Sequence, residues 1–385
     1  MIDFEMAQAV YRATVAPLAA EKVPLLQARG RLLRADAQAV CDLPPFDQSA
    51  MDGYALRAAE AVDGLAVAGR VEAGSAAGGL PQGAAMRILT GAPVPAGADA
   101  VIPQEAVDFQ GAALHFRSLP AQGANIRRRG EELRRGATLL CAGHRLQPAS
   151  IAALAAAGVG EVWASRRPKV ALLITGDELC APGSARAEAA IYDANGPFLQ
   201  SFLADWDVDL VDVIAVPDRR EAVDAALQRA LSRAELVLST GGASVGDRDF
   251  LPQAVRDAGL QLHFWKVAQK PGKPLLFASG AGRYVLAMPG NPAAVFVGAH
   301  LHLRPILERL SGASGELPWL QGQWVDPPPV HGQRLQFLRV LEGQPGRLSR
   351  LPHQASHMLS NLAQANAIAM HQPGPVRRQV AFLRL

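Results

Sequence analysis

The chain has 385 residues, of which 38 are basic and 35 acidic, so its formal net charge is only +3. This balance excludes the strongly basic surface that a nucleic-acid-binding protein needs. Hydrophobic residues make up 49% of the chain and aromatic residues 5%, so a large core can form, mainly from Ala, Val and Leu. Because single cores stop growing near roughly 250–300 residues, the length predicts about two to four domains.

Cysteine usage and hydropathy indicate a cytoplasmic protein. Three widely spaced cysteines are present: Cys41, Cys141 and Cys180. They form no CxxC pair, so they predict neither a zinc site nor a disulfide framework, and they fit a reducing compartment. The amino terminus is charged where an export signal would be apolar. Residues 284–303 lack Asp, Glu, Lys and Arg, but Pro289 and Pro292 interrupt them, so we expect a strand, a loop and a helix and no membrane contact.

The first part of the chain is typical of helices followed by short strands. We expect residues 1–43 to be mainly helical, with an Ala-rich opening and a second apolar stretch near residues 25–39. From residue 46 to 137, short apolar runs alternate with Gly and Pro turns, which favours a small β-rich domain. Residues 148–158 are helix-like and end at a Gly, and we expect this helix to pack back on the first ones. Residues 1–45 and 138–166 would then form a helical domain into which 46–137 is inserted.

The remaining chain predicts an α/β domain and a small β domain. Beyond residue 166, short apolar runs alternate with helical segments, which favours a doubly wound parallel sheet over residues 167–313. The predicted strands cover 170–175, 210–216, 235–240, 260–267, 275–278 and 284–288, and the predicted helices 197–205, 219–233, 250–258 and 292–310. A Gly- and Pro-rich linker precedes residues 318–385, whose alternating runs predict a small β-barrel or sheet.

Acidic and glycine-rich segments follow the predicted parallel strands, where ligands bind in open sheets. Glu178 follows the first strand, Asp218 the second, and a Gly-rich loop with Asp249 the third. Glycines let backbone N–H groups approach and surround an anion, and Mg²⁺ bridges carboxylates and phosphates, so a nucleotide with a divalent metal is suggested. Structural interpretations stay open, because Asp218 and Asn291 could cap the next helices and Glu178 could be a solvated loop acid.

Basic and hydroxyl groups form three further candidate clusters. The rigid KPGKP segment carries Lys270 and Lys273, and it is either an anion site or a surface turn. HQASH carries His353, Ser356 and His357, with Arg339 upstream, and such a His pair is more often surface or packing than ligand. The Arg-rich segment 127–135 is either a solvated face or a local anion site. No Walker loop, no GxGxxG after the first strand of the α/β domain, no GxSxG and no HExxH is present, so the chemistry is expected to be metal-assisted, not covalent.

Several segments, in the same order, resemble the molybdopterin molybdenumtransferases and the related C-terminal domain of gephyrin. These segments are FDQSAMDGYAL, RILTGAPVP, NIRRRGEE, TGDEL, DANGPFL, TGGASVGDRDF, KPGKP, MPGNPAA and HQASH, between Phe46 and His357. The first two distinguish this family from the single-domain molybdopterin adenylyltransferases. Ala243 stands where a Val is common, a small change that is not expected to alter the chemistry.

The resemblance implies four domains, a homodimer, and an enzyme that inserts molybdate into adenylylated molybdopterin with Mg²⁺, releasing AMP and giving the molybdenum cofactor. It also implies possible contacts with the adenylyltransferase and with cofactor-receiving enzymes. The implied catalytic residues are Asp52, Thr90, Glu178, Asp218 and Asp249, and the last three are the expected metal ligands. The expected substrate-binding residues are Gly241, Gly242, Ser244, Gly246, Asp247, Lys270, Lys273, Pro289, Pro292, Arg339, Ser356 and His357. Asp52 and Thr90 lie in another domain, so they would reach the crevice only across a dimer interface.

Two other functions occur among proteins that share the α/β domain. Gephyrin's related domain serves in receptor clustering, but such scaffolds carry further domains. An adenylyltransferase that makes the adenylylated pterin shares the α/β fold, but it lacks the additional domains. The sequence does not distinguish molybdate from tungstate.

Overall fold

The structure is a computed structural model that describes residues 1–242, 249–329, 332–375 and 377–385. It divides into two compact units. The first comprises Met1–Glu21, Gly30–Arg34 and Ala164–Leu385, and the second comprises Lys22–Arg29 and Ala35–Trp163. Each unit is described by itself.

A six-stranded sheet forms the centre of the first unit. Its order is β16 (Asp209–Val216), β13 (Lys169–Thr175), β17 (Leu236–Thr240), β21 (Arg283–Met288), β20 (Leu276–Gly280) and β18 (Gln261–Trp265). The first four strands are parallel, as the apolar runs predicted. Along β13, Leu172 packs into the core on one face and Leu173 into the core on the other. Both faces of the central strands are therefore buried, which explains why β13 and β17 are nearly continuous apolar runs, whereas the edge strand β16 is largely exposed and contains Asp209 and Asp212.

The last two strands of this sheet are antiparallel, which the prediction of a parallel sheet did not include. Gly280 and Arg283 are paired, and only Ala281 and Gly282 connect them, with φ of +49° and +74°. A two-residue turn with positive φ at both positions produces a β-hairpin, because a parallel crossover needs a much longer connection.

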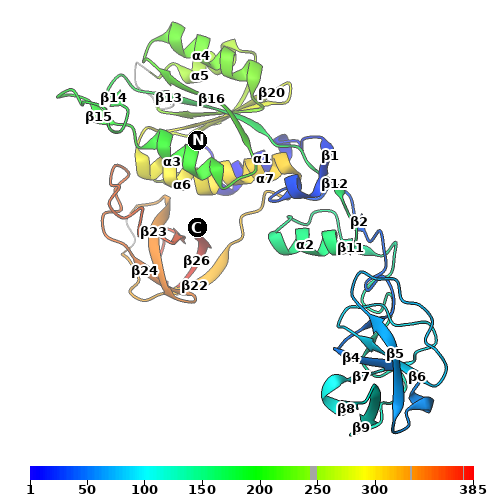
Figure 1. The fold of residues 1–385 in the computed structure, drawn as a ribbon. Coiled ribbons are helices and arrows are strands. Elements are labelled where there is room, and N and C mark those ends of the chain that lie inside the picture. Colours follow the sequence, from blue (N-terminus) through cyan, green and yellow to red (C-terminus); the bar gives the residue numbers. More distant parts are fainter. Residues whose placement is uncertain (243–248, 330–331, 376) are drawn as a thin grey trace. The chain divides into compact units, whose positions relative to one another are not determined.

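Helices cover both faces of this sheet (Figure 1). On one face lie α4 (Arg220–Arg233) and α5 (Leu251–Asp257), and on the other lie α3 (Asn195–Ala204), α6 (Pro292–Gly298) and α7 (Arg304–Ser311). The predicted helix 292–310 is one continuous helical segment in which a π-helical turn, Ala299–Leu303, joins α6 to α7. A short arm, β14 (Leu179–Cys180) and β15 (Ile191–Tyr192), projects from the carboxyl end of β13.

The first helix, α1 (Phe4–Thr14), begins at Asp3, whose side chain accepts a hydrogen bond from the N–H of Met6 at 2.7 Å. Its buried residues Phe4, Ala7 and Tyr11 belong to the core beneath α6 and α7. This packing assigns α1 to the α/β unit, whereas the sequence suggested grouping it with residues 138–166. The expectation that residues 1–43 are mainly helical holds for α1 and is wrong beyond it. There the chain forms β1 (Ala20–Pro24), a 3-10 turn (Leu25–Ala28) and β2 (Ala37–Gln38).

The C-terminal strands close into a five-stranded barrel, which confirms the predicted small β-barrel. The closed order is β23 (Leu335–Gln344), β24 (Arg347–Arg350), β22 (Leu320–Trp324), β26 (Gln379–Arg384) and β25 (Ala367–His371), which returns to β23. Trp324, Val340, Leu348 and Phe382 fill its interior. A two-residue strand, β19 (Gln269–Lys270), pairs with β23 and so ties the α/β domain to the barrel.

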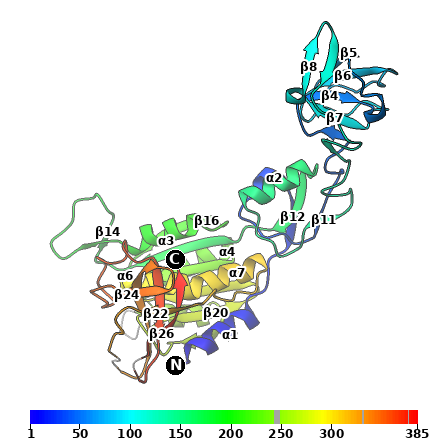
Figure 2. The ribbon, with the colours of Figure 1, turned by 90° about the horizontal axis from the view of Figure 1, so that it is seen from below.

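The second unit contains the predicted β-rich domain (Figure 2). Its six-stranded sheet has the order β7 (Ala100–Pro103), β4 (Gly53–Leu56), β6 (Ala84–Ile88), β5 (Leu65–Val71), β9 (Ala113–Phe116) and β8 (Val107–Gln110). The unit also contains β3 (Gln48–Ser49), β10 (Ile126–Arg127), β11 (Thr138–Leu140), α2 (Pro148–Ala156) and the first part of β12 (Glu161–Ser165). Gly53 is required in β4, because a Cβ there would lie 1.9 Å from the carbonyl oxygen of Ile102.

Acids neutralise much of the Arg-rich segment 127–135. Arg128 pairs with Asp47 at 2.7 Å and Arg129 with Asp42 at 2.5 Å. Backbone N–H groups of Arg129 and Arg135 also bind these two carboxylates, and they are the largest cause of the lowered pKa of Asp47 and of Asp42, respectively. These contacts favour the interpretation as a solvated face.

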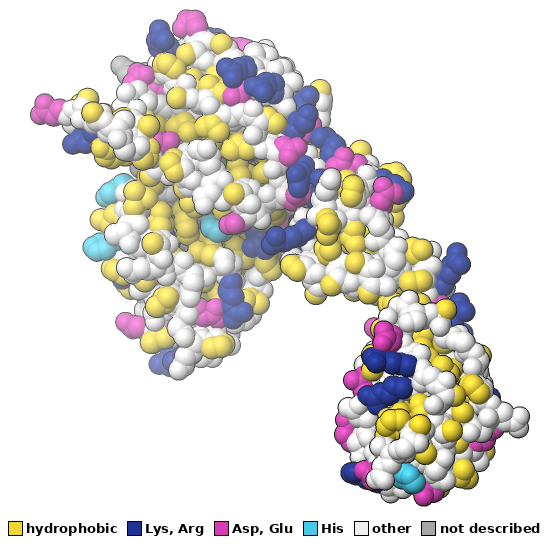
Figure 3. Space-filling view, in the orientation of Figure 1, with side chains coloured by type: hydrophobic (Ala, Val, Ile, Leu, Met, Phe, Trp, Pro, Cys, Tyr) yellow, Lys and Arg dark blue, Asp and Glu magenta, His cyan; other side chains and the backbone are white. Residues whose placement is uncertain are grey.

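The distribution of surface charge and the length of the helices can be compared with the expectation that the protein binds neither nucleic acid nor membrane. In the space-filling view, basic and acidic side chains are interspersed over the visible face of the α/β domain (Figure 3). Within the described ranges, no helix is both long enough and apolar enough to traverse a bilayer.

Candidate functional site

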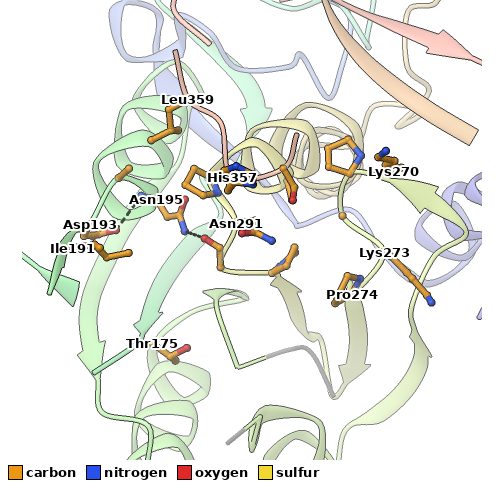
Figure 4. Close-up of a pocket in the computed structure, with 18 of the residues that line it drawn as sticks. Thr175, Ile191, Asp193, Asn195, Lys270, Lys273, Pro274, Asn291, His357 and Leu359 are labelled. Atoms are coloured by element: carbon orange, nitrogen blue, oxygen red, sulfur yellow. Dashed lines mark hydrogen bonds between the residues drawn. The ribbon is translucent and has the colours of Figure 1, made fainter. Parts of the chain in front are cut away.

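A cavity of about 730 Å³ lies at the carboxyl ends of β13 and β21. Loops from the α/β sheet form most of its wall, and a loop of the barrel completes it (Figure 4). The predicted residues on its wall are Glu178, Lys270, Lys273, Pro289, Pro292, Ser356 and His357. The cavity therefore brings together half of the predicted site residues that the structure describes.

Hydrogen bonds connect the ends of β13, β17 and β21 at the base of this cavity. The Thr175 hydroxyl donates to the carbonyl of Thr240 at 3.1 Å, and the N–H of Gly241 donates to the carbonyl of Met288 at 3.1 Å. A Cβ on Gly241, whose φ is +81°, would lie 2.4 Å from the Thr175 hydroxyl, so this position requires Gly. The ends of three neighbouring strands are thus locked to one another.

Asp193 and Asn195 are two cavity residues that were not predicted as site residues, although they belong to the DANGPFL segment. Asp193 accepts hydrogen bonds from the N–H groups of Asn195 and Gly196 at 3.0 and 2.9 Å. Asn195 in turn donates its amide to the carbonyl of Gly290 at 2.7 Å (Figure 4). A side chain on Gly196 would lie 2.3 Å from the Asp193 carboxylate. An acid two residues before an Asn-Gly pair was the available signal for this helix start.

The KPGKP loop forms another side of the cavity. Lys270 and Lys273 are exposed at its rim, whereas Gln269 beside them is fully buried. Across the cavity, Pro292 opens α6 at its first turn, as predicted, and Asn291 is the N-cap residue. The Asn291 side chain makes no capping hydrogen bond and lies on the cavity wall (Figure 4).

The barrel contributes Ser356 and His357 through a loop that is anchored to α6. The carbonyl of Ser356 accepts the N–H of Ala293 at 3.0 Å. His357 is exposed and extends over the cavity, with Arg334 also on the wall. A cavity with Lys270, Lys273, Arg334 and a hydroxyl is suited to an oxyanion.

The structure corrects the expectation that Arg339 contacts this anion. Its side chain is fully buried and is not on the described cavity wall. Its guanidinium donates to Asn361 Oδ1 at 2.6 Å and to the carbonyl of His353 at 2.6 Å. Arg339 therefore holds the loop that carries Ser356 and His357. Burial lowers the pKa of Arg339 to about 10, so it remains a cation at neutral pH.

Of the three predicted metal ligands, only Glu178 lies on the cavity wall. Asp218 exchanges hydrogen bonds with Asp177, next to Glu178: the N–H of Asp218 binds Asp177 Oδ1 at 3.1 Å, and the N–H of Asp177 binds Asp218 Oδ2 at 3.4 Å. Asp249 is half-buried just before α5. Asp218 is not the N-cap of α4, since Arg219 holds that position.

A metal would have to be held by few protein ligands. Among the described residues, no group of three or more His, Cys, Asp and Glu side chains is arranged to bind one. Mg²⁺ commonly uses one or two carboxylates together with substrate phosphates and waters, and the exposed Glu178 beside Asp177 and Asp218 fits such a requirement. Ser244, Gly246 and Asp247 lie outside the described residues. Gly242, with φ of +65°, follows Gly241 beyond β17.

The second unit contains the other two predicted catalytic residues, and they are in direct contact. Asp52 Oδ1 accepts the backbone N–H and the hydroxyl of Thr90, both at 2.7 Å. The backbone bond is the largest cause that lowers the pKa of Asp52, followed by the hydroxyl bond. Both residues are exposed, so this pair presents an ionised carboxylate on the surface of its unit.

Comparisons with known proteins identify both parts of the chain. Residues 2–158 match the family described as MoeA N-terminal region (domain I and II), and residues 171–309 match the one described as probable molybdopterin binding domain. The molybdopterin molybdenumtransferase of Haemophilus influenzae is 36% identical over 316 residues, which is 81% of this chain and 76% of that protein. The corresponding protein of Synechococcus elongatus is 40% identical over 304 residues, 76% of this chain and 75% of that one. The crystal structure of a molybdopterin biosynthesis MoeA protein from Pyrococcus horikoshii superposes with a TM-score of 0.83 at 27% identity, covering 100% of this chain and 99% of that one.

Proposed function

Because the chain belongs to the molybdopterin molybdenumtransferases, a family of transferases in molybdenum cofactor biosynthesis, we propose that it transfers molybdenum from molybdate to adenylylated molybdopterin. The products are the molybdenum cofactor and AMP. The observation that carries the proposal is the cavity at the strand ends, whose lining contains Glu178 together with Lys270, Lys273 and Ser356.

The reaction combines two chemical changes, molybdenum capture and phosphoanhydride hydrolysis. The two dithiolene thiols replace one molybdate oxygen, which leaves as water, and cleavage of the phosphoanhydride consumes one water and frees AMP. Lys270 and Lys273 attract the molybdate dianion and balance its charge, and the Ser356 hydroxyl and His357 donate hydrogen bonds to its oxygens. The Gly241–Gly242 turn offers backbone N–H groups to the phosphate or the pterin.

Glu178 is the residue that would hold Mg²⁺ at the phosphates, with Asp218 beside its loop through Asp177 and with Asp249 as a further candidate ligand. When bound, Mg²⁺ neutralises charge that develops on the phosphate oxygens. The carboxylates of Asp218 and Asp177 fix the loop that presents Glu178. Asp52, held ionised by Thr90, is proposed as a further catalytic group.

One assay separates this function from the alternatives. AMP release is expected only when molybdate, Mg²⁺ and adenylylated molybdopterin are present together. A scaffold would release no AMP, and an adenylyltransferase would consume ATP. AMP release without molybdate, or ATP consumption, would contradict the proposal.

The proposal includes a homodimer in the cytoplasm that meets the adenylyltransferase and cofactor-receiving enzymes. Light scattering tests the first part, because a strict monomer with full activity would contradict it. The three cysteines are free, which supports a reducing compartment.

A further inference from the structure

We infer that His302 and Gln269 are positioning residues for the KPGKP loop, and that they set the affinity of the cavity for molybdate. The loop carries Lys270 and Lys273 on the cavity wall. A continuous line of buried hydrogen bonds connects it to α1, about 260 residues earlier in the chain. The part that concerns molybdate rests on the proposed function, whereas the part that concerns the loop does not.

The connection has three hydrogen bonds. The Tyr11 hydroxyl lies 2.9 Å from His302 Nδ1, His302 Nε2 lies 2.9 Å from Gln269 Oε1, and Gln269 Nε2 donates to the carbonyl of Pro271 at 3.2 Å. The side chains of Tyr11, His302 and Gln269 are all 0% exposed. Since water does not reach these groups, each bond that is lost leaves a buried polar atom without a partner.

The direction of every bond follows from the last one. Gln269 donates its amide N–H to Pro271, so its Oε1 must accept from His302. His302 then carries its proton on Nε2, and its bare Nδ1 accepts the Tyr11 hydroxyl. Complete burial lowers the pKa of His302 to about 3, so the ring is neutral and this single tautomer is retained at physiological pH. A single arrangement of the three side chains therefore allows all three hydrogen bonds to form.

Packing leaves little freedom at both ends of the line. The ring of Tyr11 meets Phe277 edge-on, with centroids 4.9 Å apart, and Phe4 meets His302 at 5.6 Å. At the loop, Gly272 has a φ of +85°, and a Cβ there would lie 3.0 Å from Gln269 Nε2. The Gln269 amide thus fills the inside of the turn between Lys270 and Lys273. Its displacement would change where both ammonium groups lie.

His302 itself sits in the π-helical turn Ala299–Leu303 between α6 and α7. Such turns insert an extra residue into a helix and redirect its side chains. The same helical segment begins at Pro292 on the cavity wall. The buried ring of His302 therefore links two walls of the cavity. It is hydrogen-bonded to Gln269 at the KPGKP loop, and it belongs to the helical segment that starts at Pro292.

The test compares four variants of the full chain: His302→Leu, His302→Gln, Tyr11→Phe and Gln8→Leu. Leu removes the donor to Gln269, Gln keeps an amide donor, and Phe removes only the Tyr11 hydroxyl. Gln8 is the matched control, because it is also buried in α1 and donates to the carbonyl of Leu301 at 2.8 Å, so its hydrogen bond reaches the π-helical turn and not the loop.

The first readout needs no substrate. The chain has five lysines, Lys22, Lys169, Lys266, Lys270 and Lys273, whose acetylation rates by acetic anhydride can be followed by mass spectrometry. We expect His302→Leu and Tyr11→Phe to change the rates at Lys270 and Lys273 and to leave Lys22 and Lys169 unchanged. His302→Gln should restore the rates, and Gln8→Leu should not alter them. Unchanged rates at Lys270 and Lys273 in folded His302→Leu or Tyr11→Phe protein would overturn the inference.

The second readout is molybdate dependence. Loss of the donor to Gln269 should raise the half-saturating molybdate concentration about tenfold and leave that of adenylylated molybdopterin within about twofold. An equal loss for both substrates, or the same loss in Gln8→Leu, would indicate a merely structural role and overturn the inference. A third outcome separates the two parts of the inference. If His302→Leu changes the acetylation rates but neither His302→Leu nor Lys270→Ala changes the half-saturating molybdate concentration, the positioning of the loop is supported. The proposed role of the lysines in molybdate binding then fails.

Discussion

One oxygen of Asp52 accepts two hydrogen bonds from Thr90, one from its backbone N–H and one from its hydroxyl, both 2.7 Å long. This double contact fixes the carboxylate and keeps it ionised. We expect Thr90→Ser to retain near-normal AMP release, because a hydroxyl remains, and Thr90→Val to reduce it about tenfold or more, because one bond to the charged group is lost. Steady-state AMP release measures this. Equal rates for the Ser and Val variants would exclude a role for the hydroxyl.

Glu178 is expected to be needed for activity but not for stability, because its side chain is exposed on the cavity wall. Glu178→Gln keeps the shape and removes the charge. AMP release should fall by about a hundredfold, or should recover only at raised Mg²⁺, while the urea unfolding curve is unchanged. Glu188→Gln, in the exposed arm, is the matched control. Normal AMP release by Glu178→Gln at ordinary Mg²⁺ would remove this residue from the proposed site.

Lys270 is expected to act on molybdate more than on the pterin. Lys270→Ala should raise the half-saturating molybdate concentration by about ten- to a hundredfold, since a charge-assisted bond is worth roughly 1.5–3 kcal/mol. The half-saturating pterin concentration should change much less. Lys169→Ala serves as the control, because Lys169 is exposed and is not on the described cavity wall. Parallel losses for both substrates would argue against a molybdate role.

Arg339 is expected to stabilise the barrel loop and to act on activity only through it. Arg339→Ala removes the donors to Asn361 Oδ1 and to the carbonyl of His353, so it should destabilise the protein by about 2–4 kcal/mol. Arg347→Ala, at an exposed position of the same barrel, should change stability by less than about 0.5 kcal/mol. Urea unfolding compares the two. If Arg339→Ala were as stable as the wild type but needed a much higher molybdate concentration for half-saturation, direct contact of Arg339 with the anion would be favoured instead.

Glu342 gives the barrel a pH-dependent contribution to stability. Its carboxylate accepts two bonds from Arg384, at 2.6 and 2.7 Å, and the N–H of Gly346 at 2.7 Å. These contacts, the Arg384 bond first, lower the pKa of Glu342 from 4.5 to about 2. Because the folded state binds the proton less tightly than the unfolded state, this contribution is complete above about pH 4.5 and is lost as the pH falls through about 2.

The comparison of wild type with Glu342→Gln tests this dependence. The wild type should be the more stable protein in urea unfolding at pH 7 and at pH 5, and the difference should shrink as the pH is lowered from 4.5 toward 2. A difference that stays constant over this interval would show that the charge of Glu342 does not contribute.

The sequence was sufficient for the parts of the fold that depend on local patterns. Short apolar runs located the strands β13, β17 and β21, a strand-like segment located β16, and the alternating runs located the barrel. Those patterns do not show that β20 is antiparallel to β21. The short turn at Ala281 and Gly282 determines that orientation. The apolar stretch near residues 25–39 was also insufficient to distinguish a helix from the 3-10 turn and the short strand that form there, because tertiary contacts override weak helical propensity.

The site was predictable where chemistry and strand ends coincide. Glu178, Lys270, Lys273 and Ser356 follow from motifs and from the position of strand ends, and they do line one cavity. The interior position of Arg339 was not predictable, because the partners of its side chain lie in a loop 14–22 residues away in sequence. Gln269 and His302 were missed for a similar reason: their polarity gives no sequence signal until burial and partners are known.

The location of α1 limits how the α/β domain can be excised. A fragment that starts at residue 164 would lack Phe4, Ala7 and Tyr11, and it would expose the apolar groove under α7 that these side chains fill. It would also leave Nδ1 of His302 without its hydroxyl partner. A stable recombinant fragment therefore has to carry the first fifteen or so residues, covalently linked or supplied as a separate peptide.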